Sequence, residues 1–222
     1  MQAPPLTLEN VLLQLRDFLA VWISQIIYYN EIYPKNAFEE RKFLDSIVHQ
    51  SRVPPLADYI ERFANEMVSV LVKKEGGGKL HDVVVIIYRE SSLHVVRRYI
   101  MGLSQFVGLA DQITTLDFLS KPTEVHLARI NIPGFDWNEI YSSLRSLIFF
   151  HTEELKRTYE RSDLDLFFKL LLNTDNAVDL SGDEGQWVKL MSEEDTRRTK
   201  FVSVGEVSSG FLCFDLHNEY IL

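Results

Sequence analysis

Hydrophobic residues recur every three or four positions in three long stretches of this chain, a spacing typical of amphipathic helices. The first stretch begins at Leu8 and continues to about Ile32, and Pro34 then forces its end. The second opens at Pro54 and Pro55, since proline suits the first turn of a helix, and closes at the glycines of residues 75–79. Both segments are therefore predicted to be helices that bury one face.

The third periodic stretch runs from Trp137 to about Tyr159. Asp136 precedes it and can accept a hydrogen bond from a free amide of the first turn. We expect a third helix here, with Asp136 as its N-terminal cap.

Other runs are rich in β-branched and aromatic residues, which favours strands. Residues 83–88 form a continuous apolar run, and residues 93–101 follow across a short RESS turn, so a hairpin of two central strands is expected. Residues 123–132 and 164–172 are two further predicted strands, whereas residues 102–122 fit neither pattern.

The tail of the chain alternates in polarity. In a strand, alternation places Leu212, Phe214 and Leu216 on a core face and Asp215 and His217 on the opposite face. Together these patterns predict an α+β fold in one domain, residues 1–222, with three main helices packed on one side of a mainly antiparallel sheet.

Composition narrows the class of protein. The chain has 222 residues, 23 Lys and Arg against 32 Asp and Glu, a net charge of −9 and one cysteine. A disulfide scaffold is excluded, and we expect a reducing compartment. The acidic balance argues against direct, sequence-independent nucleic-acid binding.

The longest apolar run, residues 18–29, is shorter than the roughly 20 residues of a membrane span. No signal peptide opens the chain, so no membrane partner is expected.

No motif assembles a catalytic or metal site. The six histidines lack the spacing of metal ligands, and the GGGK run at 76–79 lacks the glycine spacing and the Ser or Thr of a phosphate loop. Cys213 is most simply a small, semi-buried strand residue, because His217 lies over ten Å away along a strand. We therefore expect no enzyme activity, no cofactor and no metal.

Several segments resemble the HORMA-domain family. These are IIYYNEIYPKNAFEERKF, VPPLADYIERF, VVVIIY followed by VVRRYIMGL, SSLRSLI and QWVK. Within that family the chain is most similar to the accessory HORMA subunits of DNA polymerase zeta, of a fungal type. The similarity extends from about residue 8 to the end of the chain.

This resemblance implies a non-catalytic adaptor of translesion synthesis in the nucleus. Such an adaptor joins the catalytic subunit of DNA polymerase zeta to the scaffold polymerase Rev-one. Members of the family hold a Pro-containing partner peptide under a C-terminal segment, the safety belt, which here would comprise about residues 173–222 after a core of about residues 8–172. Ordering such a belt costs conformational entropy, so its closure should depend on favourable interactions with the peptide.

The resemblance also assigns roles to single residues. Tyr59 and Trp187 match aromatic residues that contact the peptide, and Lys189 occupies a neighbouring contact position where vertebrate relatives have an apolar residue. From the sequence alone, Tyr59 could equally pack locally on its helix, and Trp187 could anchor the belt to the core.

Three further residues, Phe201, Asp215 and His217, match belt positions that meet the scaffold polymerase. Arg145 lies off the apolar stripe of the third helix and matches an arginine on the surface through which HORMA domains dimerise. A solvated arginine on a helix face is the alternative.

Three other hypotheses remain open. A checkpoint-type HORMA adaptor would share the fold and select a different peptide. A small hydrolase would use Cys213 or a His and Asp pair. A direct DNA-binding protein would use the basic VVRRY and DTRRTK segments, against the net charge of −9.

Overall fold

The protein has an α+β fold, and its described residues form two sheets and three long helices. The computed structural model describes residues 4–72, 80–103, 130, 135–157, 165–174, 198–209 and 212–222. The helices are α1 (Leu8–Tyr29), α2 (Pro54–Val72) and α4 (Trp137–Arg157), with a short 3-10 helix at Lys35–Ala37. The strands are β1 (Phe38–Phe43), β2 (Ser46–Ser51), β3 (Leu80–Arg89), β4 (Val95–Gly102), β5 (Leu166–Thr174), β6 (Thr199–Ser209) and β7 (Leu212–Ile221).

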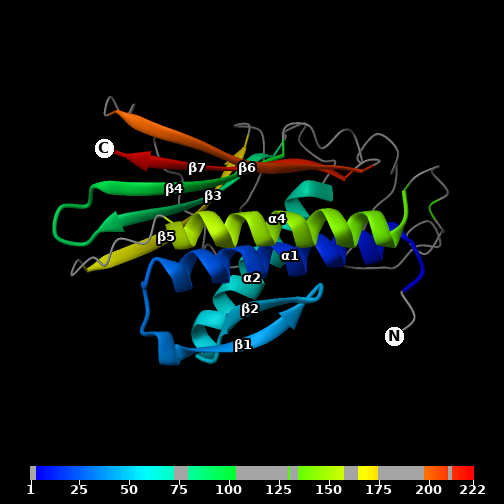
Figure 1. The fold of residues 1–222 in the computed structure, drawn as a ribbon, viewed down its shortest axis with the longest axis horizontal. Coiled ribbons are helices and arrows are strands. Elements are labelled where there is room, and N and C mark those ends of the chain that lie inside the picture. Colours follow the sequence, from blue (N-terminus) through cyan, green and yellow to red (C-terminus); the bar gives the residue numbers. More distant parts are fainter. Residues whose placement is uncertain are drawn as a thin grey trace.

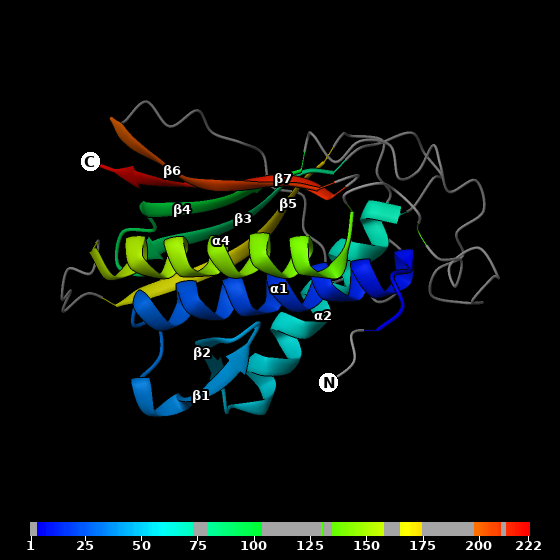
Figure 2. The ribbon, with the colours of Figure 1, turned by 45° about the vertical axis from the view of Figure 1, so that its right-hand side comes forward.

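The main sheet has five strands in the order β5-β3-β4-β7-β6, and every adjacent pair is antiparallel. Helices α1 and α4 run side by side beneath this sheet, and the separate β1–β2 hairpin lies on the far side of the helices (Figures 1 and 2). Strand β7 is the last element of the chain, yet it lies inside the sheet between β4 and β6. The predicted arrangement of three helices on one side of an antiparallel sheet is confirmed.

Helix α1 is the central element of the core. Its start is capped by Thr7, whose Oγ1 accepts a hydrogen bond from the Asn10 amide at 3.3 Å. Buried residues occur around most of its circumference, including the polar side chains of Ser24 and Gln25. The helix is long and apolar enough to cross a membrane, but 67% of that window is buried inside the protein, as a core helix requires.

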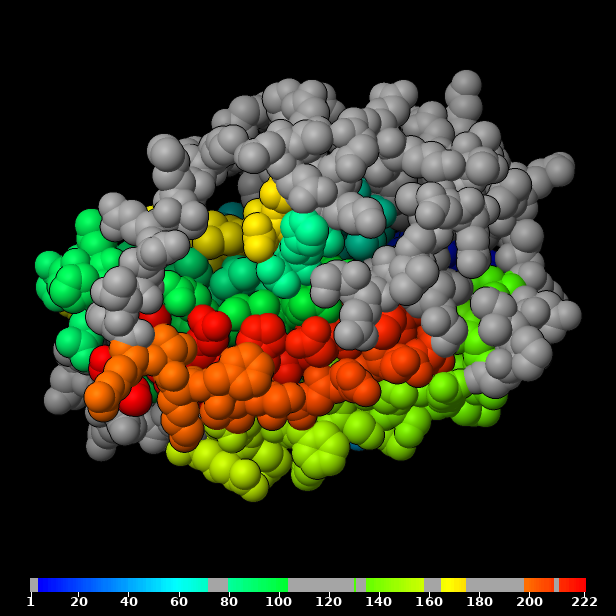
Figure 3. All heavy atoms as spheres, turned by 90° about the horizontal axis from the view of Figure 1, so that it is seen from above, coloured from blue at the N-terminus to red at the C-terminus, as the bar shows by residue number. Residues whose placement is uncertain are grey.

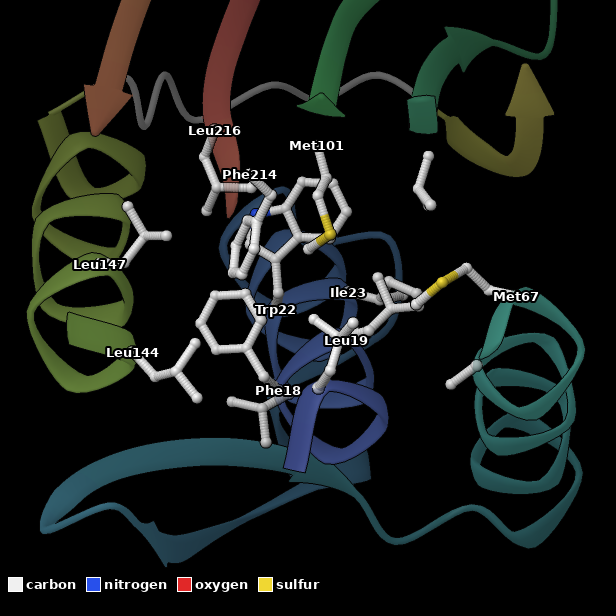
Figure 4. Close-up of a cluster of buried hydrophobic side chains, with 14 of the residues drawn as sticks. Phe18, Leu19, Trp22, Ile23, Met67, Met101, Leu144, Leu147, Phe214 and Leu216 are labelled. Atoms are coloured by element: carbon white, nitrogen blue, oxygen red, sulfur yellow. The ribbon is translucent and has the colours of Figure 1, made fainter. Parts of the chain in front are cut away.

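Side chains from every layer meet around Trp22 of α1 (Figure 4). The ring of Phe18 lies 5.4 Å from that of Phe214 in β7, between their centroids. Leu144 and Leu147 of α4 approach from one side, while Met67 of α2 approaches Leu19 and Ile23 from the other. Because each fully buried large side chain contributes about 1.5–3 kcal/mol, this cluster holds the sheet and the three helices as one core.

The main sheet is fully buried on one face only. Val83, Val85 and Ile87 of β3 point into the core, whereas the alternate residues of β3 are half-buried. The predicted β3–β4 hairpin and its central position are confirmed, but the outer face is less covered than the continuous apolar run of residues 83–88 suggested. In β7, Leu212, Phe214 and Leu216 are buried as predicted.

The β1–β2 hairpin is absent from the sequence prediction. The hydrophobic pattern indicates only a polar stretch here, because four charged side chains interrupt the alternation between Phe38 and Asp45. The hairpin is fastened to α1 through Gln25, whose Nε2 donates to the His49 carbonyl at 2.8 Å and whose Oε1 accepts from the His49 amide at 3.3 Å. The side-chain amide of Gln25 thus forms the two hydrogen bonds with the His49 backbone that a strand next to β2 would otherwise form.

Helix α1 also ends three residues earlier than expected. The side-chain amide of Asn30 donates to the Ile26 carbonyl at 2.8 Å, and Glu31 has a positive φ of 51°. The helix therefore stops at Tyr29, before Pro34 can act. At the start of α4 the prediction is confirmed, since Asp136 Oδ1 accepts from the Glu139 amide at 2.9 Å.

The prediction of a strand at 164–172 is confirmed by β5, which extends to Thr174. The predicted strand at 123–132, the unassigned stretch 102–122 and the glycine stop at 75–79 lie mostly or wholly outside the described residues.

A buried polar seam joins β7 to the helices. His151 of α4 has no exposed surface, and its ring lies 5.9 Å from the rings of both Trp22 and Tyr99, between centroids. Asn218 of β7 is also fully buried, and its Nδ2 donates to the Tyr220 hydroxyl at 3.1 Å. Burial lowers the pKa of His151 to about 3, although the neighbouring Asn218 acts in the opposite direction.

The depressed pKa of His151 predicts an acid-sensitive fold. The folded protein holds this imidazole neutral, whereas the unfolded chain binds a proton below about pH 6.5, so stability is lost as the pH falls from about 6.5 towards 3. Between about pH 7.5 and about pH 5.5, urea unfolding should show a loss of about 1.4 kcal/mol that His151→Gln or His151→Leu removes. His94→Gln, at an exposed histidine, is the control and should keep the loss. An equal pH dependence in all four proteins would contradict the prediction.

Candidate functional site

The first candidate site lies along β5, an edge strand of the main sheet. Among the described residues, β5 pairs with β3 on one side and with no strand on the other. The Glu90 amide donates to the Asp165 carbonyl at 3.1 Å, which fixes the alternation of the ladder. Residues 165, 167, 169 and 171 therefore direct their backbone groups to β3, and residues 166, 168, 170 and 172 direct theirs to the open edge. Such an edge is a template for an added strand.

Three aromatic rings line this edge on the helix side of the sheet. Tyr59 comes from α2, Phe168 from β5, and Tyr33 from the segment that follows α1. The ring centroid of Phe168 lies 6.1 Å from that of Tyr59 and 6.4 Å from that of Tyr33. Tyr59 is 41% exposed and Tyr33 is 37% exposed, so both rings present accessible faces beside the edge.

The hydroxyl of Tyr59 also reaches the backbone of the edge strand. Partial burial raises the pKa of Tyr59, and a hydrogen bond with the Leu170 backbone opposes that rise. Leu170 is one of the residues that direct their backbone groups outward. Tyr59 therefore combines an apolar face with a polar group next to the edge.

The structure thus places Tyr59 beside the open edge of β5, while Trp187 and Lys189 lie outside the described residues. Their predicted peptide contacts stay predictions. Sequence reasoning missed Tyr33 and Phe168, although Tyr33 stands in the IYP segment after the first helix and Phe168 in a predicted strand. Only the fold brings these two residues to Tyr59.

The second candidate site lies on the outer face of β6 and β7, which Figure 3 shows as adjacent strands at the surface. Phe201 is 60% exposed, and its ring centroid lies 4.8 Å from that of His217. His217 Nδ1 lies 3.0 Å from Asp215 Oδ2. The three residues predicted to meet a scaffold polymerase therefore form one cluster.

Gly102 of β4 makes room for this cluster. It lies opposite Asp215 in the β4–β7 register, and a Cβ atom at Gly102 would lie 2.5 Å from Asp215 Oδ1. Any other residue would therefore displace the carboxylate that contacts His217.

The third candidate site is the outward face of α4. Arg145 is exposed there, and Phe149 and Phe150 are 56% and 57% exposed, with ring centroids 5.7 Å apart. Arg145 also lies near Asp45 in the β1–β2 turn. The pKa of Asp45 is lowered mainly by a hydrogen bond from Lys42 and by the Lys42 charge, and the charge of Arg145 lowers it further. The face thus combines an arginine with two exposed aromatic rings that sequence reasoning does not single out.

The described residues contain no group of three or more His, Cys, Asp or Glu side chains that could hold a metal ion. Cys213 is half-buried in β7 and forms no disulfide. The described side chains thus form three candidate surfaces: the aromatic-lined edge of β5, the outer cluster on β6 and β7, and the outward face of α4.

The sequence is also similar to known proteins. The family model for the HORMA domain matches residues 12–212. The DNA polymerase zeta processivity subunit of Arabidopsis thaliana is 34% identical over 81 residues, which are 36% of this chain and 36% of that protein. The subunit of the same name from Saccharomyces cerevisiae (strain ATCC 204508 / S288c) is 27% identical over 165 residues, 72% of this chain and 56% of that protein. The mitotic spindle assembly checkpoint protein MAD2B of Danio rerio is 35% identical over 100 residues, 45% of each chain. The chain therefore spans between about a third and a little over half of the length of these curated relatives.

Solved structures share the fold at low identity. A chain of a mitotic checkpoint complex has a TM-score of 0.71 at 14% identity, with 96% of this chain and 99% of that chain covered. C. elegans HTP-1 bound to the HIM-3 closure motif has a TM-score of 0.65 at 10% identity, with 98% and 93% covered.

The close approach at Gly102 yields a prediction. Gly102→Ala should push the Asp215 carboxylate away from His217 and cost about 1 kcal/mol of stability, because the atom displaced is the end of a side chain. In the background of Asp215→Ala the same substitution should cost less, since the clash is gone. Thermal unfolding of the two single variants and the double variant measures this coupling. Additive costs would contradict the proposed contact.

Proposed function

Because this chain belongs to the HORMA-domain family, we propose that it is a non-catalytic adaptor subunit of DNA polymerase zeta. It binds a Pro-containing peptide of the catalytic subunit along β5 and presents a second surface to the scaffold polymerase Rev-one. The observation that carries the proposal is the open edge of β5 beside Tyr59, Phe168 and Tyr33. Named relatives from a plant and a fungus support the choice of DNA polymerase zeta.

An extended peptide suits this edge physically. Its backbone would pair with the outward amides and carbonyls of β5, and its side chains would alternate between the two faces of the sheet. A proline in the peptide costs little conformational entropy on binding and packs well against tyrosine rings. Affinity would come from the backbone pairing and selectivity from the rings.

The topology is compatible with a safety belt. Strands β5 and β6 occupy opposite edges of the main sheet, so residues 175–197 connect one edge to the other. In the proposal this connection crosses the bound peptide, and the β6–β7 hairpin fastens its far end to β4. Trp187 and Lys189 belong to this connection and are proposed to contact the peptide from the side opposite Tyr59.

The outer cluster of Phe201, Asp215 and His217 is the proposed contact for the scaffold polymerase. It lies at the opposite edge of the sheet from β5, so the two partners would not compete for one surface. The nucleus is the compartment that this function requires. A dimer of two HORMA domains through the Arg145 face of α4 stays a prediction.

A checkpoint-type HORMA adaptor is the second candidate. The similarity to the Danio rerio checkpoint protein favours it, and it would use the same edge for a different peptide. The identity of the peptide that binds separates the two functions.

Tyr59 provides the direct test of the peptide site. In calorimetry of the full chain with peptides of the catalytic subunit, Tyr59→Ala should weaken binding by at least about tenfold, about 1.4 kcal/mol. Tyr59→Phe should keep most of the affinity if the ring dominates. Trp187→Ala is expected to weaken binding to a similar degree. Unchanged affinity in Tyr59→Ala would contradict the proposed groove, and failure of the wild type to bind would favour a checkpoint-type partner.

The outer cluster is tested separately. Phe201→Ala should reduce co-purification with the scaffold polymerase by about tenfold or more, since an exposed ring on a strand face is a typical interface anchor. The same variant should bind the peptide of the catalytic subunit as the wild type does. Loss of both partners together would argue against two independent surfaces.

A further inference from the structure

The open edge of β5 has a second flank, on the face of the sheet turned away from the helices. There Phe167, which is 41% exposed, lies opposite Tyr88 of β3, and their ring centroids are 6.1 Å apart. Lys169, two residues along β5, is exposed, and its Nζ lies 5.1 Å from the centroid of the Tyr88 ring. This outer flank consists of an aromatic wall and one ammonium group, and it borders the same stretch of edge as Tyr59 and Phe168.

Strand geometry determines how a bound segment meets the two flanks. The ligand residue opposite Phe168 shares its face, so its side chain lies on the helix side among Tyr33, Tyr59 and Phe168. The two neighbouring ligand residues lie on the outer face, one beside Phe167 and one beside Lys169. In a non-hydrogen-bonded antiparallel pair the opposing Cα atoms are only about 4.5 Å apart, within reach of both side chains.

Charge selects among the residues that could occupy the outer positions. The chain carries a net charge of −9, and Asp165 and Glu90 are exposed at the start of β5, but the ionic side chain on the other side of Phe167 is the cation of Lys169. Its ammonium lies over the Tyr88 ring of β3, on the outer face of the sheet. The flexible four-carbon stem of a lysine lets the ammonium turn from that ring to a carboxylate on a strand added beside β5. Arg89, also exposed, adds positive charge at the end of β3.

We propose that the β5 edge selects an extended segment with a defined order of three side chains. The middle residue of the segment packs against Tyr59 and Phe168. One of its two neighbours is acidic and pairs with Lys169, and the other is apolar and packs on the rings of Phe167 and Tyr88. The inference rests on the proposed function, because it names the chemistry of the peptide that the same edge binds. Lys169 is thus a specificity-determining residue, and Tyr59 supplies affinity without regard to charge.

The test is a selection of random peptides coexpressed in bacteria with the full chain, so that a peptide is present while the protein folds. Wild type should enrich Asp or Glu next to the residue that fills the aromatic pocket, and Lys169→Glu should reverse that preference to Lys or Arg. Lys200→Glu is the matched control, because Lys200 also lies over a tyrosine ring, 5.9 Å from the centroid of Tyr220, but on the opposite edge strand. It should leave the preference unchanged.

For the wild type, calorimetry should show that the affinity of a selected peptide falls about two- to fivefold when its acidic residue is replaced by an uncharged one. The same replacement in the peptide should cause no such fall for Lys169→Glu. If Lys169→Glu leaves the selected composition unchanged while Tyr59→Ala still abolishes selection, the charge inference is wrong and the peptide-binding function stands. If wild type selects no peptide whose binding depends on Tyr59, the proposed function fails, and the inference fails with it.

Discussion

The fold depends on the burial of α1. This helix exposes so little of its surface that it must be enclosed on all sides, by the main sheet above it, by α2 and α4 beside it, and by the β1–β2 hairpin below it (Figures 1 and 2). Each of these elements reaches its place by packing on α1, including β7, whose Phe214 meets Phe18. The proposed binding surfaces follow from this enclosure, because they lie where the described helices do not cover the sheet, at the edge of β5 and on the outer face of β6 and β7.

Polar groups within the core determine how the elements fit together. The carbonyl oxygen of the Asn30 side chain accepts from Arg97 at 2.6 Å, and the Asn30 amide lies 2.9 Å from the Tyr99 hydroxyl, so the end of α1 is joined to β4. Burial raises the pKa of Tyr99 to about 12, which keeps this hydroxyl protonated as a partner for Asn30. Between β7 and α4, the Tyr220 hydroxyl accepts from Asn218 at 3.1 Å and donates to Glu154 Oε1 at 3.3 Å. Apolar packing alone would permit β7 to shift by two residues, whereas a buried polar group restricts it to one register.

Periodicity predicted the three helices, the central hairpin and the face of β7 that enters the core, because each of these segments buries one continuous apolar stripe. It failed for β1 and β2, which are short and charged and whose order depends on Gln25, a residue distant in sequence. The candidate site was predictable only in part. Tyr59, Phe201, Asp215 and His217 followed from the resemblance, but their partners Tyr33, Phe168 and Gly102 come from other elements. A pairing between β4 and β7, more than a hundred residues apart, leaves no local signal in the sequence.

The position of β7 has a consequence for synthesis of the protein. Strands β5, β3 and β4 can form a three-stranded sheet before β7 has been translated, and at that stage both of its edges are open. The edge of β4 is the more prone to aggregation, because its partner β7 follows more than a hundred residues later in the chain and β4 stays unpaired until then. Nascent chains should therefore require chaperone protection late in translation. Under the proposed function, a partner that is present during this interval meets the β5 edge before the fold is complete.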